Sequence, residues 1–126
     1  MDLKGYFDRA KGTGVLATSD KEGKVNVALY ARPHVNEDKS ISFIMADRLS
    51  HANLQENEQA AYIFTEDGRG YEGKRLILKK LSEDTDPEKI EALRRRPLKK
   101  VCKGNYDEKR FLVTFEIVEE RPLVGS

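Results

Sequence analysis

The sequence predicts a mainly β protein with short helices: a small antiparallel barrel of five or six strands. Two observations predict this class. Short apolar runs are separated by polar turns, and several of the runs have apolar residues at every second position, which is the period of a strand. Only short stretches show helical spacing. The strands follow one another closely, without a linker or internal repeat, which predicts a single domain over residues 1–126.

The N-terminal part predicts a helix followed by a β-hairpin. Apolar residues at helical spacing predict a helix from about Asp2 to Lys11: Leu3, Tyr6, Phe7 and Ala10. A strand at Gly14–Thr18, the turn SDKEG and a long extended run at Val25–Val35 then predict the hairpin. The two-residue repeat divides the second strand into two faces, one formed by Val25, Val27, Leu29 and Ala31 and the other by Asn26, Ala28, Tyr30 and Arg32. We expect one face to be core and the other to be available for binding.

The middle of the chain predicts a strand, a polar turn, a short helix and a second strand, a combination that can hold a phosphate. The strands are expected at about Ser40–Ala46 and Ala60–Thr65, with the helix between them at Arg48–Asn57. Arg48 supplies a fixed positive charge, and Ser50 is a candidate helix N-cap. The first backbone N–H groups of a helix have no partner inside it, so an anion is the expected occupant.

The C-terminal half predicts two further strands with a helix between them. The strands are expected at Lys74–Leu81 and Phe111–Val118. Asp86 followed by Pro87 is a typical helix start, and this helix is expected to end before Pro97. The basic segment Arg94–Lys103 has an acidic neighbour, which favours a solvated helix end over a nucleic-acid site.

Composition excludes several functional classes. The chain has 23 Lys and Arg against 22 Asp and Glu, a net charge of +1, so no global field attracts nucleic acid or an acidic membrane. Cys102 is the only cysteine, which excludes an internal disulfide and a cysteine-based zinc site within one chain. We find no signal-peptide pattern and no apolar run long enough to span a membrane, so we expect a soluble, cytoplasmic protein. His34 and His51 are each isolated in a polar turn, which favours surface histidines over metal ligands.

The order of elements and two sequence segments resemble the flavin mononucleotide (FMN)-binding split-barrel family that includes pyridoxamine 5'-phosphate oxidases. The segments are GVLATSDKEGKVNVALY and SFIMADRLSHANLQENEQAAYIF; family helices of the type NLxxNPxxA correspond here to NLQENEQAA. The resemblance covers most of the chain. It implies an antiparallel, six-stranded split β-barrel of Greek-key type, and a homodimer with FMN at the subunit interface.

The resemblance also implies which residues meet the cofactor. By position these are Asn26, Val27 and Ala28 against the ring, Ile44 and Met45 beside it, and Arg48, Leu49 and Ser50 at the phosphate. Many family members have a lysine in the phosphate turn, and here Arg48 is the only basic residue that can replace it. The chain has no Trp and ends in EERPLVGS, which departs from the substrate-recognising C-terminus of the vitamin B6 oxidases and argues against oxidation of pyridoxamine phosphate.

These features predict an oxidoreductase in which flavin carries out hydride or electron transfer with a small-molecule donor or acceptor. No side chain is assigned a catalytic role, because the cofactor performs the chemistry. Two alternatives remain: a non-enzymatic barrel that carries flavin or haem, and a related enzyme that uses a deazaflavin.

Overall fold

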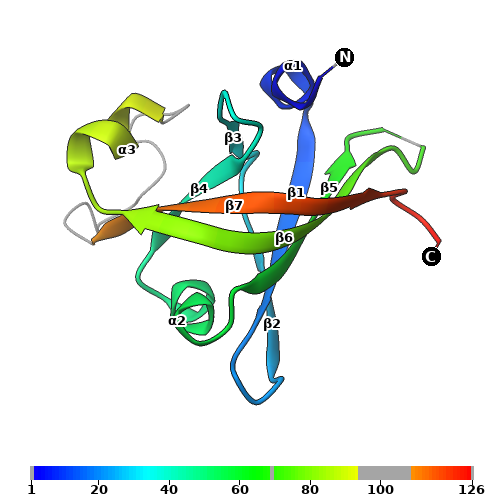
Figure 1. Cartoon of the computed structure of the whole chain (residues 1–126). Helices are drawn as coiled ribbons and strands as arrows, with labels where there is room; N and C mark the ends of the chain where they lie inside the picture. Colours follow the sequence, from blue (N-terminus) through cyan, green and yellow to red (C-terminus); the bar gives the residue numbers. More distant parts are fainter. Residues whose placement is uncertain (1, 69, 94–108, 126) are drawn as a thin grey trace.

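The computed structural model describes residues 2–68, 70–93 and 109–125, which contain a seven-stranded antiparallel sheet and three short helices (Figure 1). Their order along the chain is α1 (Leu3–Arg9), β1 (Gly12–Ser19), β2 (Val25–Leu29), β3 (His34–Val35), β4 (Ile41–Ala46), α2 (Leu49–Glu56), β5 (Gln59–Glu66), β6 (Gly73–Asp84), α3 (Pro87–Leu93) and β7 (Arg110–Arg121). The predicted mainly β, antiparallel class is confirmed.

The strand order across the sheet is β2-β1-β5-β6-β7-β4-β3, so the described part of the chain has seven strands in an open sheet where six were predicted. The difference arises in the run Val25–Val35, which is not one strand. It ends as β2 at Leu29 and resumes as β3 at His34, directly after the buried Pro33, which has no N–H to give to a strand ladder. Before it, Arg32 Nη1 donates to the carbonyls of Phe7 at 3.0 Å and Ala10 at 2.7 Å. The chain therefore crosses to the far edge of the sheet, where β3 pairs with β4.

The sheet curls so that the parts near its two edges meet. Tyr30, just after β2, packs edge-on against Phe43 of β4, with 5.9 Å between ring centroids. The hydroxyl of Tyr62, on β5, donates towards the carbonyls of Tyr30 at 3.3 Å and Ala31 at 3.2 Å. Strands that stand far apart in the sheet order are thereby brought around one core, which is the arrangement of a split barrel.

Aromatic side chains fill the centre of this curled sheet. Phe43 contacts both Tyr62 and Phe115, with centroids 4.9 and 5.8 Å apart. Helix α1 covers one end and inserts Phe7, which is fully buried and packs edge-on against Phe64. Edge-to-face pairs of this kind contribute about 0.5–1.5 kcal/mol beyond the area they bury.

Strands β6 and β7 are long and irregular, and extend beyond the predicted bounds. Their pairing shifts register at Ile77/Leu78 and again at Lys80/Ser82, so that β6 continues to Asp84 beside the end of α2. Helix α3 starts at the predicted Pro87. The predicted end of that helix, the basic segment Arg94–Lys103 and Cys102 lie outside the described residues. Within residues 2–68, 70–93 and 109–125, no helix has the length and hydropathy of a membrane-spanning segment.

Candidate functional site

Strand β2 stands at an edge of the sheet and exposes its most apolar face. Val25, Val27 and Leu29 are 75%, 66% and 74% exposed, whereas Asn26 and Ala28 on the opposite face are half-buried. The face available for binding is thus the apolar one. Exposed apolar side chains gathered in this way are more typical of a contact surface than of an ordinary surface strand.

Helix α2 begins at Leu49, with Arg48 as its N-cap residue and no side-chain hydrogen bond at the cap. The prediction that Ser50 is the N-cap is therefore wrong. Ser50 is the second residue of the helix, is only 4% exposed, and forms a hydrogen bond with the hydroxyl of Tyr30. Burial raises the pKa of Tyr30, and the bond from Ser50 opposes that rise. Arg48 and Leu49 are exposed at the same end of the helix.

Polar side chains hold α2 against the sheet. Ser50, His51 and Asn53 are each 6% exposed or less, and Leu54 is the large apolar side chain that the helix buries. Asn53 Nδ2 donates to the hydroxyl of Thr18 on β1 at 3.0 Å. Hydrogen bonds are directional, so these contacts determine the orientation of the helix more tightly than apolar packing alone.

His51 lies between two carboxylates. Its Nδ1 is 3.0 Å from Asp47 Oδ1, and its Nε2 is 3.1 Å from Glu83 Oε2 on β6. The ring stacks on Phe111 of β7 at 3.8 Å between centroids and 16° between planes. The expectation of a surface histidine is wrong here: His51 is 6% exposed, and it is buried because both ring nitrogens have partners.

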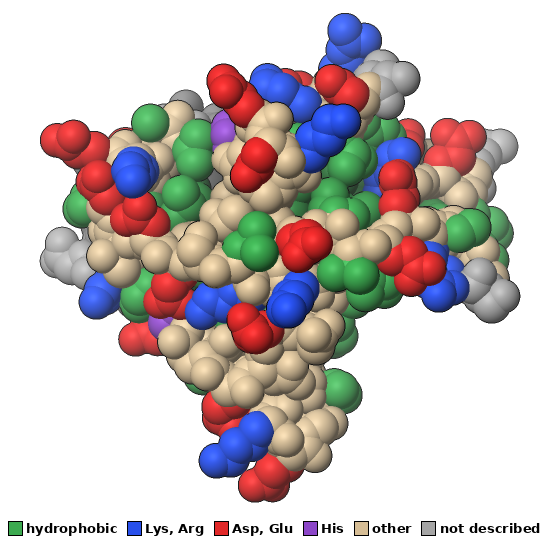
Figure 2. Space-filling view, in the orientation of Figure 1, with side chains coloured by type: hydrophobic (Ala, Val, Ile, Leu, Met, Phe, Trp, Pro, Cys, Tyr) green, Lys and Arg blue, Asp and Glu red, His purple; other side chains and the backbone are tan. Residues whose placement is uncertain are grey.

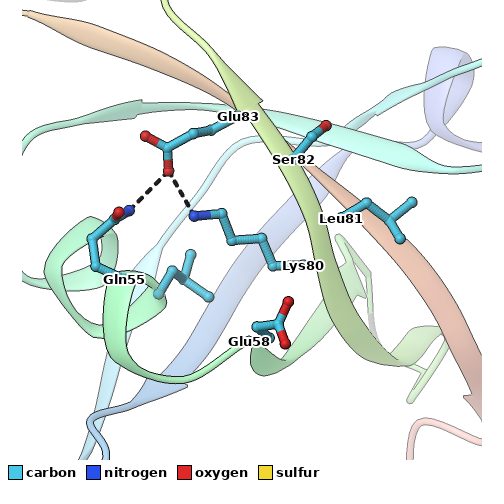
Figure 3. A pocket seen from close by; sticks show the side chains of 7 residues that line it. Gln55, Glu58, Lys80, Leu81, Ser82 and Glu83 are labelled. Atoms are coloured by element: carbon cyan, nitrogen blue, oxygen red, sulfur yellow. Dashed lines mark hydrogen bonds and ion pairs between the residues drawn. The ribbon is translucent and has the colours of Figure 1, made fainter.

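Glu83 is itself held by three donors, of which Figure 3 shows Lys80 and Gln55. Lys80 Nζ donates to its Oε1 at 2.7 Å and Gln55 Nε2 to the same oxygen at 2.8 Å, in addition to the contact with His51. Desolvation by burial raises the pKa of this carboxyl, but the hydrogen bonds from Lys80, Gln55 and His51 outweigh it and lower the pKa to about 2. Glu83 therefore joins α2 to β6 as a carboxylate.

An open hollow of about 380 Å³ lies between α2 and β6 beside this network (Figure 3). It is lined by Leu54, Gln55, Glu58, Lys80, Leu81, Ser82 and Glu83. None of the residues expected to meet a flavin is among them, and Lys80 is already paired with Glu83. We do not assign the hollow to the cofactor.

The residues that the sequence assigned to a cofactor lie on three segments. Asn26–Ala28 are on β2, Ile44 and Met45 on β4, and Arg48–Ser50 at the start of α2. Tyr30 connects the three segments, since it follows β2, packs on Phe43 of β4 and bonds to Ser50 of α2. Ile44 is half-buried, but Met45 is fully buried on the core side.

Three residues of this region were not predicted from the sequence: Tyr30, His51 and Glu83. A signal existed for Tyr30, which shares the predicted strand face of Asn26 and Ala28. None existed for the pairing of His51 with Glu83, which are 32 positions apart and meet only through the register shift at Lys80/Ser82.

The described residues contain no group of three or more His, Cys, Asp or Glu arranged to hold a metal ion. Figure 2 shows Lys and Arg interspersed with Asp and Glu over the visible face, without a region of one sign. That face lacks the basic patch typical of a nucleic-acid-binding surface.

Comparison with known proteins gives matches among solved structures. No family model matches the chain, and no curated protein does. An FMN-binding protein from Syntrophomonas wolfei subsp. wolfei superimposes with a TM-score of 0.72 at 19% identity, over 98% of this chain and 85% of that one. An F420 reductase superimposes with a TM-score of 0.70 at 13% identity, over 94% of this chain and 95% of that one.

A third structure comes from Clostridium acetobutylicum and is described as related to general stress protein 26 of Bacillus subtilis, in the pyridoxinephosphate oxidase family. It gives a TM-score of 0.65 at 14% identity, over 93% of this chain and 86% of that one. At such identities the likeness concerns the fold, and it extends over nearly the whole chain. The protein therefore has the split-barrel fold of FMN-binding and pyridoxamine 5'-phosphate oxidase-like proteins, as its sequence predicted.

Proposed function

We propose that this protein is an FMN-binding flavoprotein that transfers hydride or electrons as a homodimer. One observation carries the proposal: Tyr30, directly after β2, contacts both Phe43 of β4 and Ser50 at the start of α2, on a fold that an FMN-binding protein shares. A bound isoalloxazine supplies the redox chemistry, and the chain binds and orients it.

The start of α2 suits a phosphate. The side chain of the N-cap residue, Arg48, makes no hydrogen bond to the first N–H groups of the helix, and its guanidinium adds a positive charge at the same end. A guanidinium binds phosphate in a bidentate way, which suits it to the place that lysine takes in many family members. Because the Ser50 hydroxyl bonds to Tyr30, we assign to Ser50 a main-chain contact with the phosphate rather than a hydroxyl contact.

Strand β2 suits the flavin ring. As an edge strand, it pairs with β1 on one side, and in the described sheet its other edge has no neighbouring strand. Main-chain N–H and C=O groups of Asn26–Ala28 are thus in position to meet polar atoms at the edge of a ring. Ile44, half-buried on β4, would supply apolar contact.

A second copy of the chain would cover the apolar face of β2. Val25, Val27 and Leu29 form that face, and the cofactor would lie beside it at the seam. Val27→Asp should convert a dimer to a monomer in sedimentation velocity, because a charge buried in the seam would have no partner. Val118→Asp is the matched control, since Val118 is 57% exposed on β7. A dimer that persists in Val27→Asp would contradict this interface.

The first test is the visible absorption spectrum of the purified protein after addition of FMN and removal of the excess. A retained flavin spectrum supports the proposal, and a colourless protein contradicts it. Arg48→Ala should weaken FMN binding by about 10- to 100-fold, because hydrogen bonds to charged groups contribute about 1.5–3 kcal/mol, and should hardly change riboflavin binding. Arg121→Ala, far from α2 in the sequence and paired with Glu119, is the control. Equal losses for FMN and riboflavin would refute the phosphate assignment.

A second candidate is use of a deazaflavin, which the fold shared with an F420 reductase favours. Competition between FMN and the deazaflavin for the protein distinguishes the two cofactors. Oxidation of a reduced nicotinamide by the loaded protein distinguishes an enzyme from a carrier, and a haem-type band would indicate a haem carrier instead.

A further inference from the structure

Helix α2 depends on its surroundings for its position. It has eight residues, too few for a stable isolated helix in water. Its buried side chains are mostly polar, and Leu54 is the only large apolar one among them. The direction of its first turn is therefore determined by hydrogen-bonded partners on the sheet.

His51 connects that first turn to the sheet. The contact between His51 Nδ1 and Asp47 closes a loop of five residues, 47–51, which contains the proposed phosphate-binding residues Arg48, Leu49 and Ser50. On its other side His51 Nε2 contacts Glu83 of β6. The loop is thus attached to the strand that forms the middle of the sheet.

The partners of His51 restrict its movement. Stacking on Phe111 fixes the plane of the ring, and Glu83 is fixed by Lys80 and Gln55. The contact with His51 Nδ1 turns the Asp47 carboxylate, which directly precedes Arg48, towards the imidazole ring.

We infer that His51 and Glu83 are positioning residues, which hold the 47–51 loop in the geometry that distinguishes a phosphorylated flavin from an unphosphorylated one. The inference rests on the proposed function, because it concerns the same phosphate turn. It adds a residue that determines the preference for FMN from outside the turn. This residue is Glu83, on β6, a strand that carries none of the predicted cofactor residues. Neither residue needs to touch the ligand.

The test compares the dissociation constants for FMN and riboflavin, measured by flavin fluorescence, in the full chain and its variants. Glu83→Gln and His51→Gln should each reduce the preference for FMN by at least about fivefold, with riboflavin affinity unchanged. The double variant should lose no more than either single variant, because the two residues act as one unit. Glu58→Gln is the matched control, since Glu58 lines the same hollow and is exposed.

A further variant avoids the buried residues. Gln55 is exposed and donates to Glu83, so Gln55→Ala should fold and should reduce the FMN preference by about two- to threefold. If the wild-type protein binds FMN and riboflavin equally, the proposed phosphate site fails. If the wild type prefers FMN, and Gln55→Ala and every folded variant of His51 or Glu83 keep that preference, only the positioning role is overturned.

Discussion

Replacing Glu83 with glutamine should destabilise the protein at neutral pH but not in acid. The carboxyl has a pKa of about 2 in the folded protein, against an ordinary value of 4.5, because Lys80, Gln55 and His51 bond to the ionised form. A folded-state pKa below that of the unfolded chain means that folding favours the carboxylate. Its contribution is therefore complete above about pH 5 and disappears as the pH falls towards 2.

The size of the effect follows from the same values. A fall in pKa from 4.5 to about 2 means that Glu83 contributes at most roughly 3 kcal/mol to the free energy of unfolding, at about 1.4 kcal/mol per pKa unit. The Glu83 side chain is 25% exposed, and screening by solvent reduces this to about 1–2 kcal/mol.

Urea denaturation of wild type and Glu83→Gln at several pH values between 7 and 2.5 measures the difference. We expect a difference of about 1–2 kcal/mol at pH 5 and roughly a quarter of that at pH 2.5, where the pH is close to the folded-state pKa of about 2. Glu58→Gln should have little effect on stability at any of these pH values. A loss in Glu83→Gln that is the same at pH 5 and pH 2.5 would refute the reasoning.

Three further changes test the structure around the site by urea denaturation. Asn53→Ala should lower the free energy of unfolding by about 1–2 kcal/mol, since it removes the partner of the buried Thr18 hydroxyl, and an unchanged value would contradict that bond. Tyr62→Phe should cost about 1 kcal/mol, because two carbonyls lose a donor, and a neutral result would argue against these contacts. Gly14→Ala should cost about 2–3 kcal/mol, because its Cβ would clash with the Tyr62 hydroxyl and the Tyr30 carbonyl oxygen; a stable variant would mean that this close approach is wrong.

Local sequence patterns predicted most of the elements. The alternation along β6 and β7, the Asp86–Pro87 helix start and the helix before β1 each depend on residues close in sequence, and the structure contains all of them. The break at Pro33 was missed because the residues on either side continue an extended pattern. Pro33 is a local signal against a continuous strand, and the contacts of Arg32 with the carbonyls of Phe7 and Ala10 accompany the change of direction.

The candidate site was less predictable than the fold. Ser50 has the residue type of an N-cap, but Tyr30, 20 positions away, bonds to its hydroxyl once the sheet has curled. Likewise, the polar neighbours of His51 in the sequence suggested exposure, whereas Asp47, Glu83 and Phe111 surround it in the fold. In both cases a deciding partner comes from a segment that is distant in the sequence, which a local pattern does not contain.

The two edges of the sheet differ in how they avoid unwanted pairing. Strand β3 is two residues long and offers little to an incoming strand, whereas β2 presents five consecutive residues, VNVAL, none of them charged or proline. Natural edge strands usually resist aggregation by being short, charged or covered. The edge at β3 is thus protected by its length, whereas β2 would need a cover, such as the partner subunit proposed above, to be protected from pairing with other chains.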